Sequence, residues 1–363
     1  MTDNSKLQQI ARLFVKDNEI TTIAPLGNGL INDTFIVKTD GTDTPDYVLQ
    51  RINNSIFTDV ELLQNNIVAV TRHIRKKLEE QGTTDINRRV LHFLETDSRR
   101  TYVRDDDGNY WRMSVYIKDS HTIDVVDCNS AEACGAAFGN FESMLSDLKE
   151  PLGETIPRFH DMELRADQLL EAVGNDAVGR LKDVREEVSL LQSMTNDMCV
   201  AEQLHREGLL PKRICHCDTK VNNMLLDNNG NVLCVIDLDT VMPSFIFSDY
   251  GDFLRTAANT VAEDEPDTDK VAFREDIFQA FTRGYLQTAA NFITDTERKH
   301  LSFAVALFPY MQATRFLTDY INGDTYYKTK YPEHNLDRTR NQIALLQRIL
   351  EKMPRIEKYI QNI

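Results

Sequence analysis

A β-rich segment set among helical patterns constrains the fold of this chain most strongly. Residues 213–239 read RICHCDTKVNNMLLDNNGNVLCVIDLD, with apolar runs on both sides of an Asn-Asn-Gly turn at 228–230. This pattern predicts a β-hairpin. The surrounding segments with helical spacing lie near residues 130–147, 177–207, 269–288, 295–321 and 335–351. A hairpin embedded in a helical region is a specific architecture, and we expect the functional residues at its two polar ends.

The first third of the chain is rich in strand patterns instead. Strands are expected at 20–26, 32–39, 47–53, 89–96, 101–111 and 111–117, the last two turning at Asp107 and Gly108, and a helix is expected at 59–80. We therefore predict an α+β fold with a small β-rich N-terminal lobe, residues 1–117, and a larger, mainly helical C-terminal lobe, residues 118–363. A ligand is expected in a cleft between two such lobes.

Two cysteines in the embedded segment suggest a metal site at first sight. Cys215, His216, Cys217 and Asp218 are consecutive. Zinc sites usually place two to four residues between paired cysteines, and in a strand His216 would point away from its neighbours. The sequence has no second pair with zinc spacing. Buried cysteines that pack as small apolar residues are therefore the better interpretation, and His216 is expected to support the loop through hydrogen bonds.

A second pattern in this segment, H-x-D-x-K-x-x-N, fits phosphoryl transfer. Asp218 would accept the proton of the attacking hydroxyl group, Lys220 would offset negative charge, and Asn223 would offer Mg²⁺ the hard oxygen ligand that it prefers. A partner carboxylate for the metal is expected across the hairpin, and Asp237 is found there. Asp239 follows on the same face of an extended segment, where we expect it to contact the acceptor substrate.

A glycine turn, GNGLIN, marks the expected nucleotide end of the cleft. Gly27 and Gly29 let main-chain N–H groups approach phosphate oxygens, and Asn32 follows them. Protein kinases carry a lysine on the third strand, where this chain has Gln50. If Gln50 faces the nucleotide, the phosphates depend more on Mg²⁺ and on main-chain groups. Tyr116 lies where the chain would cross between the lobes, beside the expected adenine position.

The motifs HCDTKVNN, VIDLDTVMP and SDYGDFLR resemble the choline kinase/aminoglycoside phosphotransferase superfamily, whose fold is protein-kinase-like. The block RFLTDYINGDTYYKTKYPEHNLDRTRNQ is similar to bacterial N-acetylhexosamine 1-kinases, a likeness that runs nearly end to end. This resemblance implies an ATP- and Mg²⁺-dependent kinase acting on the anomeric hydroxyl of N-acetylglucosamine or N-acetylgalactosamine. It assigns the same base and metal ligands as above, and it implies that Arg315 and Tyr326 bind the sugar. Leu30 replaces a histidine of those kinases, so the acceptor preference can differ.

The composition limits the kinds of partner that this chain can bind. The net charge of −16 and the pI of about 5.0 argue against nucleic-acid binding, which needs a basic surface. An anionic nucleotide would have to bind as its metal complex, or the entrance to its binding site would have to be locally basic. The scattered cysteines predict reduced thiols, and without a signal peptide or a membrane-length apolar run we expect a cytoplasmic protein. No oligomer is implied.

Two alternatives remain open at this point. The same chemistry can act on another small alcohol, such as choline, ethanolamine, an aminoglycoside or a different hexose, and an acidic cleft suits a cationic acceptor. A pseudokinase or binding module is the alternative from another class, with Gln50 and Leu30 as signs of decay. The presence of Asp218, Asn223 and Asp237 argues against that second alternative.

Overall fold

The computed structural model describes residues 4–16, 19–27, 31–41 and 44–363. Two compact units interleave along the chain. Unit 1 comprises Met1–Thr122, Asp147–Pro157 and Met224–Met242. Unit 2 comprises Ile123–Ser146, Arg158–Asn223 and Pro243–Ile363. Each unit is built from three separate segments of the chain, so the units do not correspond to two consecutive lobes. The predicted lobe boundary between residues 117 and 118 stays a prediction.

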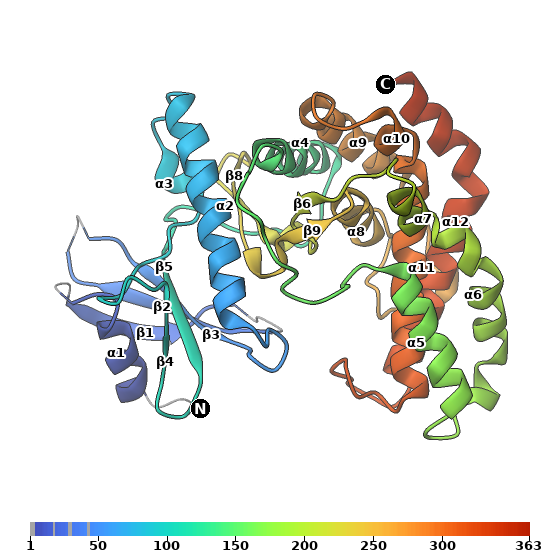
Figure 1. Cartoon of the computed structure of the whole chain (residues 1–363), viewed down its shortest axis with the longest axis horizontal. Helices are drawn as coiled ribbons and strands as arrows, with labels where there is room; N and C mark the ends of the chain where they lie inside the picture. Colours follow the sequence, from blue (N-terminus) through green and yellow to red (C-terminus); the bar gives the residue numbers. More distant parts are fainter. Residues whose placement is uncertain (1–3, 17–18, 28–30, 42–43) are drawn as a thin grey trace. The chain divides into compact units, whose positions relative to one another are not determined.

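Unit 1 is built on a five-stranded antiparallel sheet in the order β1-β2-β3-β5-β4 (Figure 1). The strands are β1 (Ile20–Pro25), β2 (Asp33–Thr39), β3 (Tyr47–Ile52), β4 (Tyr102–Arg104) and β5 (Tyr110–Val115). The helices of this unit are α1 (Asn4–Arg12), α2 (Val60–Glu80) and α3 (Ile86–Arg89). Side chains of α1 such as Leu7 and Ile10 pack with Leu49 and Trp111 of the sheet into one apolar core. Alternating apolar residues thus gave a correct prediction for these strands.

The strand predicted at residues 89–96 is wrong. The segment forms one isolated bridge, between Phe93 and Ser114 of β5, and its first residue ends α3. The reason lies at the edge of β5, because β4 already pairs with Tyr110, Trp111 and Arg112 there. Little of that edge remains for a second strand, and a local apolar pattern cannot reveal this competition.

The predicted hairpin is confirmed and lies in unit 1. Strands β7 (Met224–Leu226) and β8 (Val232–Val235) pair antiparallel. The side chain of Asp227 accepts the main-chain N–H groups of Asn229 and Asn231, and Gly230 takes a positive φ of 82° in the turn. The short 3₁₀ helix η3 (Leu238–Thr240) follows, so the second polar border of the hairpin is a turn rather than an extended strand.

Unit 2 is mainly helical. Its helices are α4 (Cys128–Leu145), α5 (Met162–Asn175), α6 (Arg185–Met198), α7 (Val200–Arg206), α8 (Phe247–Ala257), α9 (Glu275–Ala289), α10 (Asp295–Lys299), α11 (Leu301–Ile321) and α12 (His334–Asn362). The short 3₁₀ turns are η1 (Leu181–Asp183), η2 (Val221–Asn223) and η4 (Thr268–Lys270), and β6 (Arg213–Cys215) pairs with β9 (Met242–Ser244). Helix α11 is buried along most of its length and packs against α5, α8 and α12. The α+β fold class predicted from the sequence is confirmed.

The sequence patterns differ from these helices in two ways. The segment expected at 177–207 contains η1, α6 and α7, so it is interrupted rather than one helix. Helices α5 and α8 were not predicted. In α5 the fully buried residues are Met162, Leu169 and Ala172, a weak periodic signal, whereas α8 buries charged and apolar residues alike. No helix in the described part of the chain is both long and apolar enough to cross a membrane.

Helices α4 and α9 cross at glycines. A Cβ atom added to Gly284 would lie 1.9 Å from the main-chain oxygen of Glu132, and one added to Gly135 would lie 2.2 Å from that of Phe281. Each contact is with main chain, which cannot rotate away as a side chain can. The two helices therefore approach closely because neither carries a side chain at the crossing.

We expect Gly284→Ala to lower the free energy of unfolding by about 1–3 kcal/mol or more, because overpacking forces the helices apart. Urea denaturation measures the change. The matched control is Gly174→Ala in α5, where an added Cβ meets nothing within 4 Å; there alanine should be neutral or stabilise by up to about 1 kcal/mol. Equal effects at both positions would contradict the close crossing.

Candidate functional site

The catalytic loop of the sequence pattern is held by a buried carboxylate on α8. Asp249 accepts the main-chain N–H groups of His216 and Cys217, each at 2.7 Å, and its own main-chain oxygen accepts the hydroxyl of Thr219 at 2.8 Å. Cys217 has a φ of 63°, a left-handed conformation that is unusual for a residue other than glycine. The bonds to Asp249 determine this turn, which the sequence motif alone did not indicate.

His216 takes the supporting position expected for it. Its side chain is fully buried and lies edge-on to the rings of Phe138 and Phe141. Its Nδ1 atom accepts the main-chain N–H of Asp218 at 3.3 Å. The imidazole is therefore buried behind the loop and orients it through this hydrogen bond.

Asp218, Lys220 and Asn223 are brought together. The ammonium of Lys220 lies 2.9 Å from one carboxylate oxygen of Asp218 and 3.1 Å from the other. The amide nitrogen of Asn223 donates to the main-chain oxygen of Asp218 at 2.8 Å and to its carboxylate at 3.3 Å. Burial raises the pKa of Asp218, but Lys220 and Asn223 outweigh it and leave the pKa below its ordinary value. Asp218 is thus ionised at neutral pH, as a proton acceptor must be.

Helix α8 also contributes to a cluster of charged side chains close to this loop. Asp252 and Glu263 both bind Arg255, at 3.1 Å and 2.7 Å. Burial raises the pKa of Asp252, while Arg255 lowers it, and Asp218 and Lys220 also act on it electrostatically. These residues were not predicted from the sequence, although the three-residue spacing of Asp252 and Arg255 in SDYGDFLR is typical of an ion pair on one helix face.

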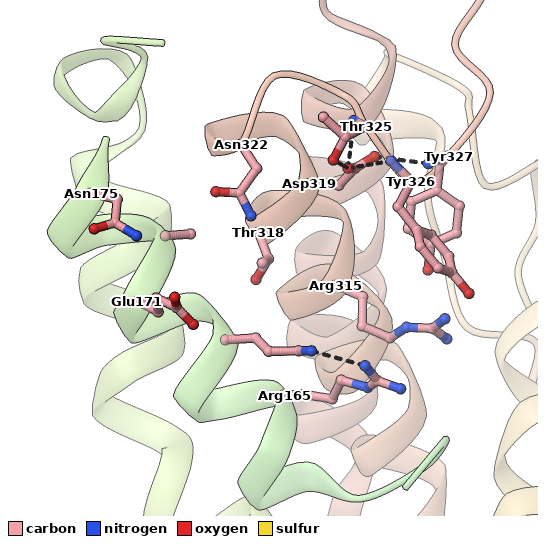
Figure 2. A pocket seen from close by; sticks show the side chains of 12 residues that line it. Arg165, Glu171, Asn175, Arg315, Thr318, Asp319, Asn322, Thr325, Tyr326 and Tyr327 are labelled. Atoms are coloured by element: carbon pink, nitrogen blue, oxygen red, sulfur yellow. Dashed lines mark hydrogen bonds between the residues drawn. The ribbon is translucent and has the colours of Figure 1, made fainter. Parts of the chain in front are cut away.

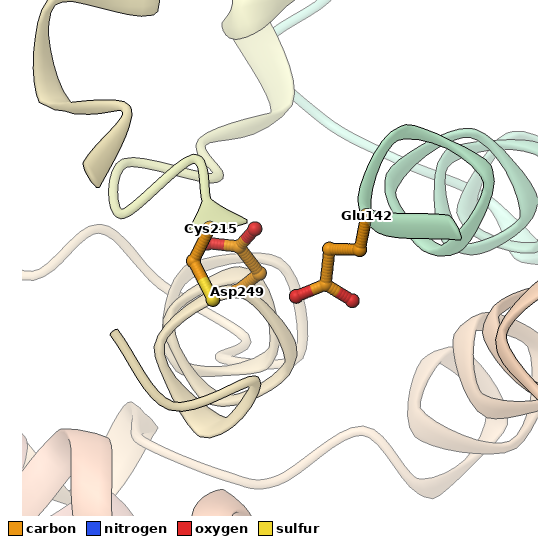
Figure 3. Close-up of side chains that lie close together, drawn as sticks. All are labelled: Glu142, Cys215 and Asp249. Atoms are coloured by element: carbon orange, nitrogen blue, oxygen red, sulfur yellow. The ribbon is translucent and has the colours of Figure 1, made fainter. Parts of the chain in front are cut away.

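The cysteines do not form the paired thiolate site considered from the sequence. The atoms of Cys215 that could bind a metal do lie within 4.8 Å of those of Glu142 and Asp249 (Figure 3). Both carboxylate oxygens of Asp249, however, accept main-chain N–H groups, and Glu142 accepts the hydroxyl of Tyr285. Burial raises the pKa of Cys215 and of Glu142 well above their ordinary values, which disfavours the thiolate and the carboxylate that a metal would need. This cluster supports the catalytic loop, and its cysteine packs as a buried thiol.

The other predicted metal ligand lies in unit 1. Asp237 has φ 59° and ψ 57°, immediately before η3. Because the amide nitrogen of Asn223 is engaged with Asp218, its oxygen remains the atom suited to a cation. A carboxylate and an amide oxygen are the hard donors that Mg²⁺ takes. The residue types therefore fit a magnesium site, and the roles of Asn223 and Asp237 as its ligands stay a prediction.

The predicted nucleotide residues also lie in unit 1. Gly27 has a φ of 70°, whereas Gly29 and Leu30 lie outside the described residues. Gln50 donates to the hydroxyl of Thr34 at 3.2 Å and accepts from the Nε atom of Arg112 at 3.0 Å. The main-chain N–H of Tyr116 donates to the main-chain oxygen of Asp46 at 2.8 Å, and the ammonium of Lys38 lies 5.5 Å from the centre of its ring. Their contacts with a nucleotide stay predictions.

Asp239, predicted to contact the acceptor, is almost fully buried. One carboxylate oxygen accepts the amide of Asn32 at 2.7 Å and the other pairs with the guanidinium of Arg112. Both oxygens are therefore engaged within unit 1, and contact with an acceptor stays a prediction. Arg112 was not predicted from the sequence, because a basic residue inside a strand pattern carries no local mark of function.

A pocket of about 340 Å³ lies between α5, α11 and the loop that follows α11 (Figure 2). Arg315 and Tyr326 both line it, and the guanidinium of Arg315 lies 5.9 Å from the Tyr326 ring and 5.6 Å from the Tyr327 ring. Tyr326 is 59% exposed, so its ring is open to a ligand. The buried carboxylate of Asp319 accepts the main-chain N–H groups of Thr325, Tyr326 and Tyr327 at 2.8–3.0 Å. This one side chain shapes the loop that presents both tyrosines.

Arg165 adds a second positive charge to the pocket. It extends from α5 toward the same side as Arg315 (Figure 2). Burial and the charge of Arg315 lower the pKa of Arg165 to about 10. Within the described part of the chain, neither guanidinium forms an ion pair with a carboxylate, and their side-chain partners are Gln168 and Gln312. No local pattern marks Arg165, which lies 150 residues before Arg315 in the chain.

Comparison with known proteins places this arrangement in context. The model of the phosphotransferase enzyme family matches residues 22–290. An aminoglycoside phosphotransferase from Alicyclobacillus acidocaldarius superposes with a TM-score of 0.63 at 15% identity, covering 98% of this chain and 96% of that one. A choline/ethanolamine kinase family protein from Mesorhizobium loti gives 0.57 at 16%, covering 98% and 99%. An amicoumacin kinase in complex with AMP-PNP, Ca²⁺ and Ami gives 0.56 at 12%, covering 97% and 93%. At these identities the structures show the shared fold.

We expect Lys220→Met to move the acidic limb of the kcat/KM profile to higher pH. Removing the cation leaves burial, which raises the pKa of Asp218, so the ionised base is lost at a higher pH than in the wild type. Steady-state rates between pH 4 and 8 measure the shift. Lys149→Met, at an exposed position, is the control and should leave the limb in place. An unmoved limb in Lys220→Met would contradict the proposed coupling.

Proposed function

Because this chain belongs to the phosphotransferase enzyme family, we propose that it transfers the γ-phosphate of ATP to the anomeric hydroxyl of an N-acetylhexosamine. The observation that carries the chemistry is the ionised carboxylate of Asp218, held between Lys220 and Asn223. The observation that supports the acceptor is the pocket that Arg315 and Tyr326 share.

Asp218 is the proposed general base. Its carboxylate accepts the hydroxyl proton as the sugar oxygen forms a bond to the γ-phosphorus and the bond to ADP breaks. Lys220 offsets the negative charge that builds up beside it. Mg²⁺, when bound, would neutralise the phosphates, held by the amide oxygen of Asn223 and the carboxylate of Asp237. Phosphoryl transfer depends mainly on such positioning and electrostatics, which suits a site made of one base and a few charged groups.

The acceptor pocket suits a neutral, oxygen-rich molecule. A guanidinium offers several N–H donors to sugar and acyl oxygens, and a tyrosine offers a hydrogen bond and a flat face. Arg165 and Arg315 bring two guanidinium groups to this pocket, and the carboxylates of Glu171 and Asp319 also line it. Asp319 is buried and accepts main-chain N–H groups of the loop, so the guanidinium groups and the exposed Glu171 are the charges that a ligand would meet. We therefore propose an N-acetylated sugar, whose oxygens can accept from both guanidinium groups, rather than choline, ethanolamine or an aminoglycoside.

The pocket and the catalytic loop also share an electrostatic environment within unit 2. The buried imidazole of His160 has its pKa lowered well below the ordinary value by burial and then by Arg315, Arg165 and Arg255. Arg255 in turn binds Asp252, on which Asp218 acts. His160 thus stays neutral between the pocket arginines and the residues beside the base.

A matched pair of acceptors tests the proposal. With ATP and Mg²⁺, we expect N-acetylglucosamine or N-acetylgalactosamine to yield a sugar 1-phosphate, identified by ³¹P–¹H coupling to the anomeric proton. Glucosamine and galactosamine, which carry an ammonium in place of the acetamido group, should be much poorer acceptors because of the pocket arginines. Choline, ethanolamine and kanamycin complete the panel. Turnover of a cationic acceptor without turnover of either N-acetylhexosamine would overturn the substrate assignment.

Asp218→Asn tests the base. We expect kcat to fall by about 10²–10⁴-fold, the usual contribution of a general base, while the affinity for Mg·ATP measured by calorimetry stays within a few-fold of wild type. Asp197→Asn, an exposed change on α6, is the control and should keep full activity. Near-normal turnover by Asp218→Asn would refute the mechanism.

A further inference from the structure

We propose that Arg112 is a positioning residue for the carboxylate of Asp237, acting through its buried ion pair with Asp239. The inference rests on the proposed function, since it assigns Asp237 to the metal–nucleotide complex. Arg112 lies on β5, the strand next to β3, and its guanidinium pairs with Asp239, two residues after Asp237.

The side chains of Arg112 and Asp239 are 2% and 3% exposed, so their ion pair is shielded from water. Arg112 is the cross-strand partner of Gln50, and its Nε atom donates to the Gln50 side chain at 3.0 Å. Its guanidinium also lies 5.4 Å from the ring of Phe93. The position of the guanidinium is thus fixed on three sides, and its pairing with Asp239 is directional.

Asn32 completes the hold on Asp239. Its amide nitrogen donates to the carboxylate oxygen that Arg112 leaves open, at 2.7 Å, and its amide oxygen accepts the main-chain N–H of Asn53 at 2.9 Å. The network therefore joins the exit of the glycine turn, the end of β3, the middle of β5 and the start of η3. These segments are far apart in the sequence and all belong to unit 1.

Asp237 needs such support because its conformation is costly. It is left-handed, with φ 59° and ψ 57°, two residues before the anchored Asp239. A residue other than glycine persists in this region only where its surroundings determine it. Asp239 anchors the turn on one side, and the amide of Asn66 binds the main-chain oxygen of Val241 at 3.0 Å at its exit. Arg112 thus acts on Asp237 through the main chain of a short turn.

Direct contact between Arg112 and the phosphates does not fit this geometry. Its side chain is buried, and Asp239 and Gln50 hold two of its donors. A lysine on a third strand acts by touching phosphate; Arg112 instead presents the metal-binding turn. Loss of Arg112 should therefore weaken the binding of nucleotide only when the metal is present.

The experiment compares wild type with Arg112→Gln, Asp239→Asn and the double variant. Calorimetry measures the affinity for ATP with Mg²⁺ and with EDTA, and thermal unfolding measures stability. Arg112→Gln leaves a buried charge unpaired and should lower the melting temperature, whereas the double variant removes both charges and should recover most of it. In the double variant we still expect at least a tenfold loss of the enhancement of ATP binding by Mg²⁺. Arg104→Gln, an exposed change on β4, is the control.

The outcomes separate this inference from the proposed function. A double variant that recovers stability and keeps the wild-type Mg²⁺ enhancement would overturn the positioning role of Arg112. An equal loss of ATP affinity with and without Mg²⁺ would overturn it too, because that result indicates a general packing role. If the wild type shows no Mg²⁺-dependent ATP binding, the proposed function fails together with this inference.

Discussion

Two hydrogen bonds from the main chain of His216 and Cys217 to the carboxylate of Asp249 fix the loop from which the proposed base projects. The loop has no sheet partner over these residues, and Cys217 is left-handed, a conformation that costs roughly 1–3 kcal/mol. A buried carboxylate can accept several N–H groups at once, so one side chain determines the whole turn. The buried side chains of Cys215 and Glu142 lie next to Asp249 and complete the packing that supports Asp218.

Two other loops are shaped in the same way. Asp239 holds the turn that bears Asp237, and Asp319 accepts three successive main-chain N–H groups of the loop that presents Tyr326. Asp239 lies within the turn that it holds and accepts side-chain donors from distant segments, whereas Asp319 lies near the end of α11 and organises the loop that follows. A buried carboxylate without such partners would be strongly unfavourable. Part of the large excess of acidic residues therefore serves the internal structure, and the net charge of −16 does not describe the sites.

The acceptor pocket illustrates that difference between bulk and local charge. The net charge of the chain is strongly negative, yet this pocket combines the guanidinium groups of Arg165 and Arg315 with the carboxylates of Glu171 and Asp319. The proposed acceptor rests on these few groups, because interactions with a bound ligand depend on the charges within several ångströms of it. Similarity in fold to kinases of amino alcohols and aminoglycosides does not carry this information, since function depends on the site and not on the fold.

The sequence by itself determined the reaction class and much of the architecture. Alternation predicted the five strands of the sheet, the Asn-Asn-Gly turn predicted the hairpin, and spacing joined Asp218 to Lys220 and Asn223, because these features are local. Tertiary structure decided the rest. The competition for the edge of β5 removed the strand expected at 89–96, and the partners Asp249, Arg112 and Arg165 come from distant elements. No local pattern marks such partners, since their roles arise only when packing brings them to a buried carboxylate or a shared pocket.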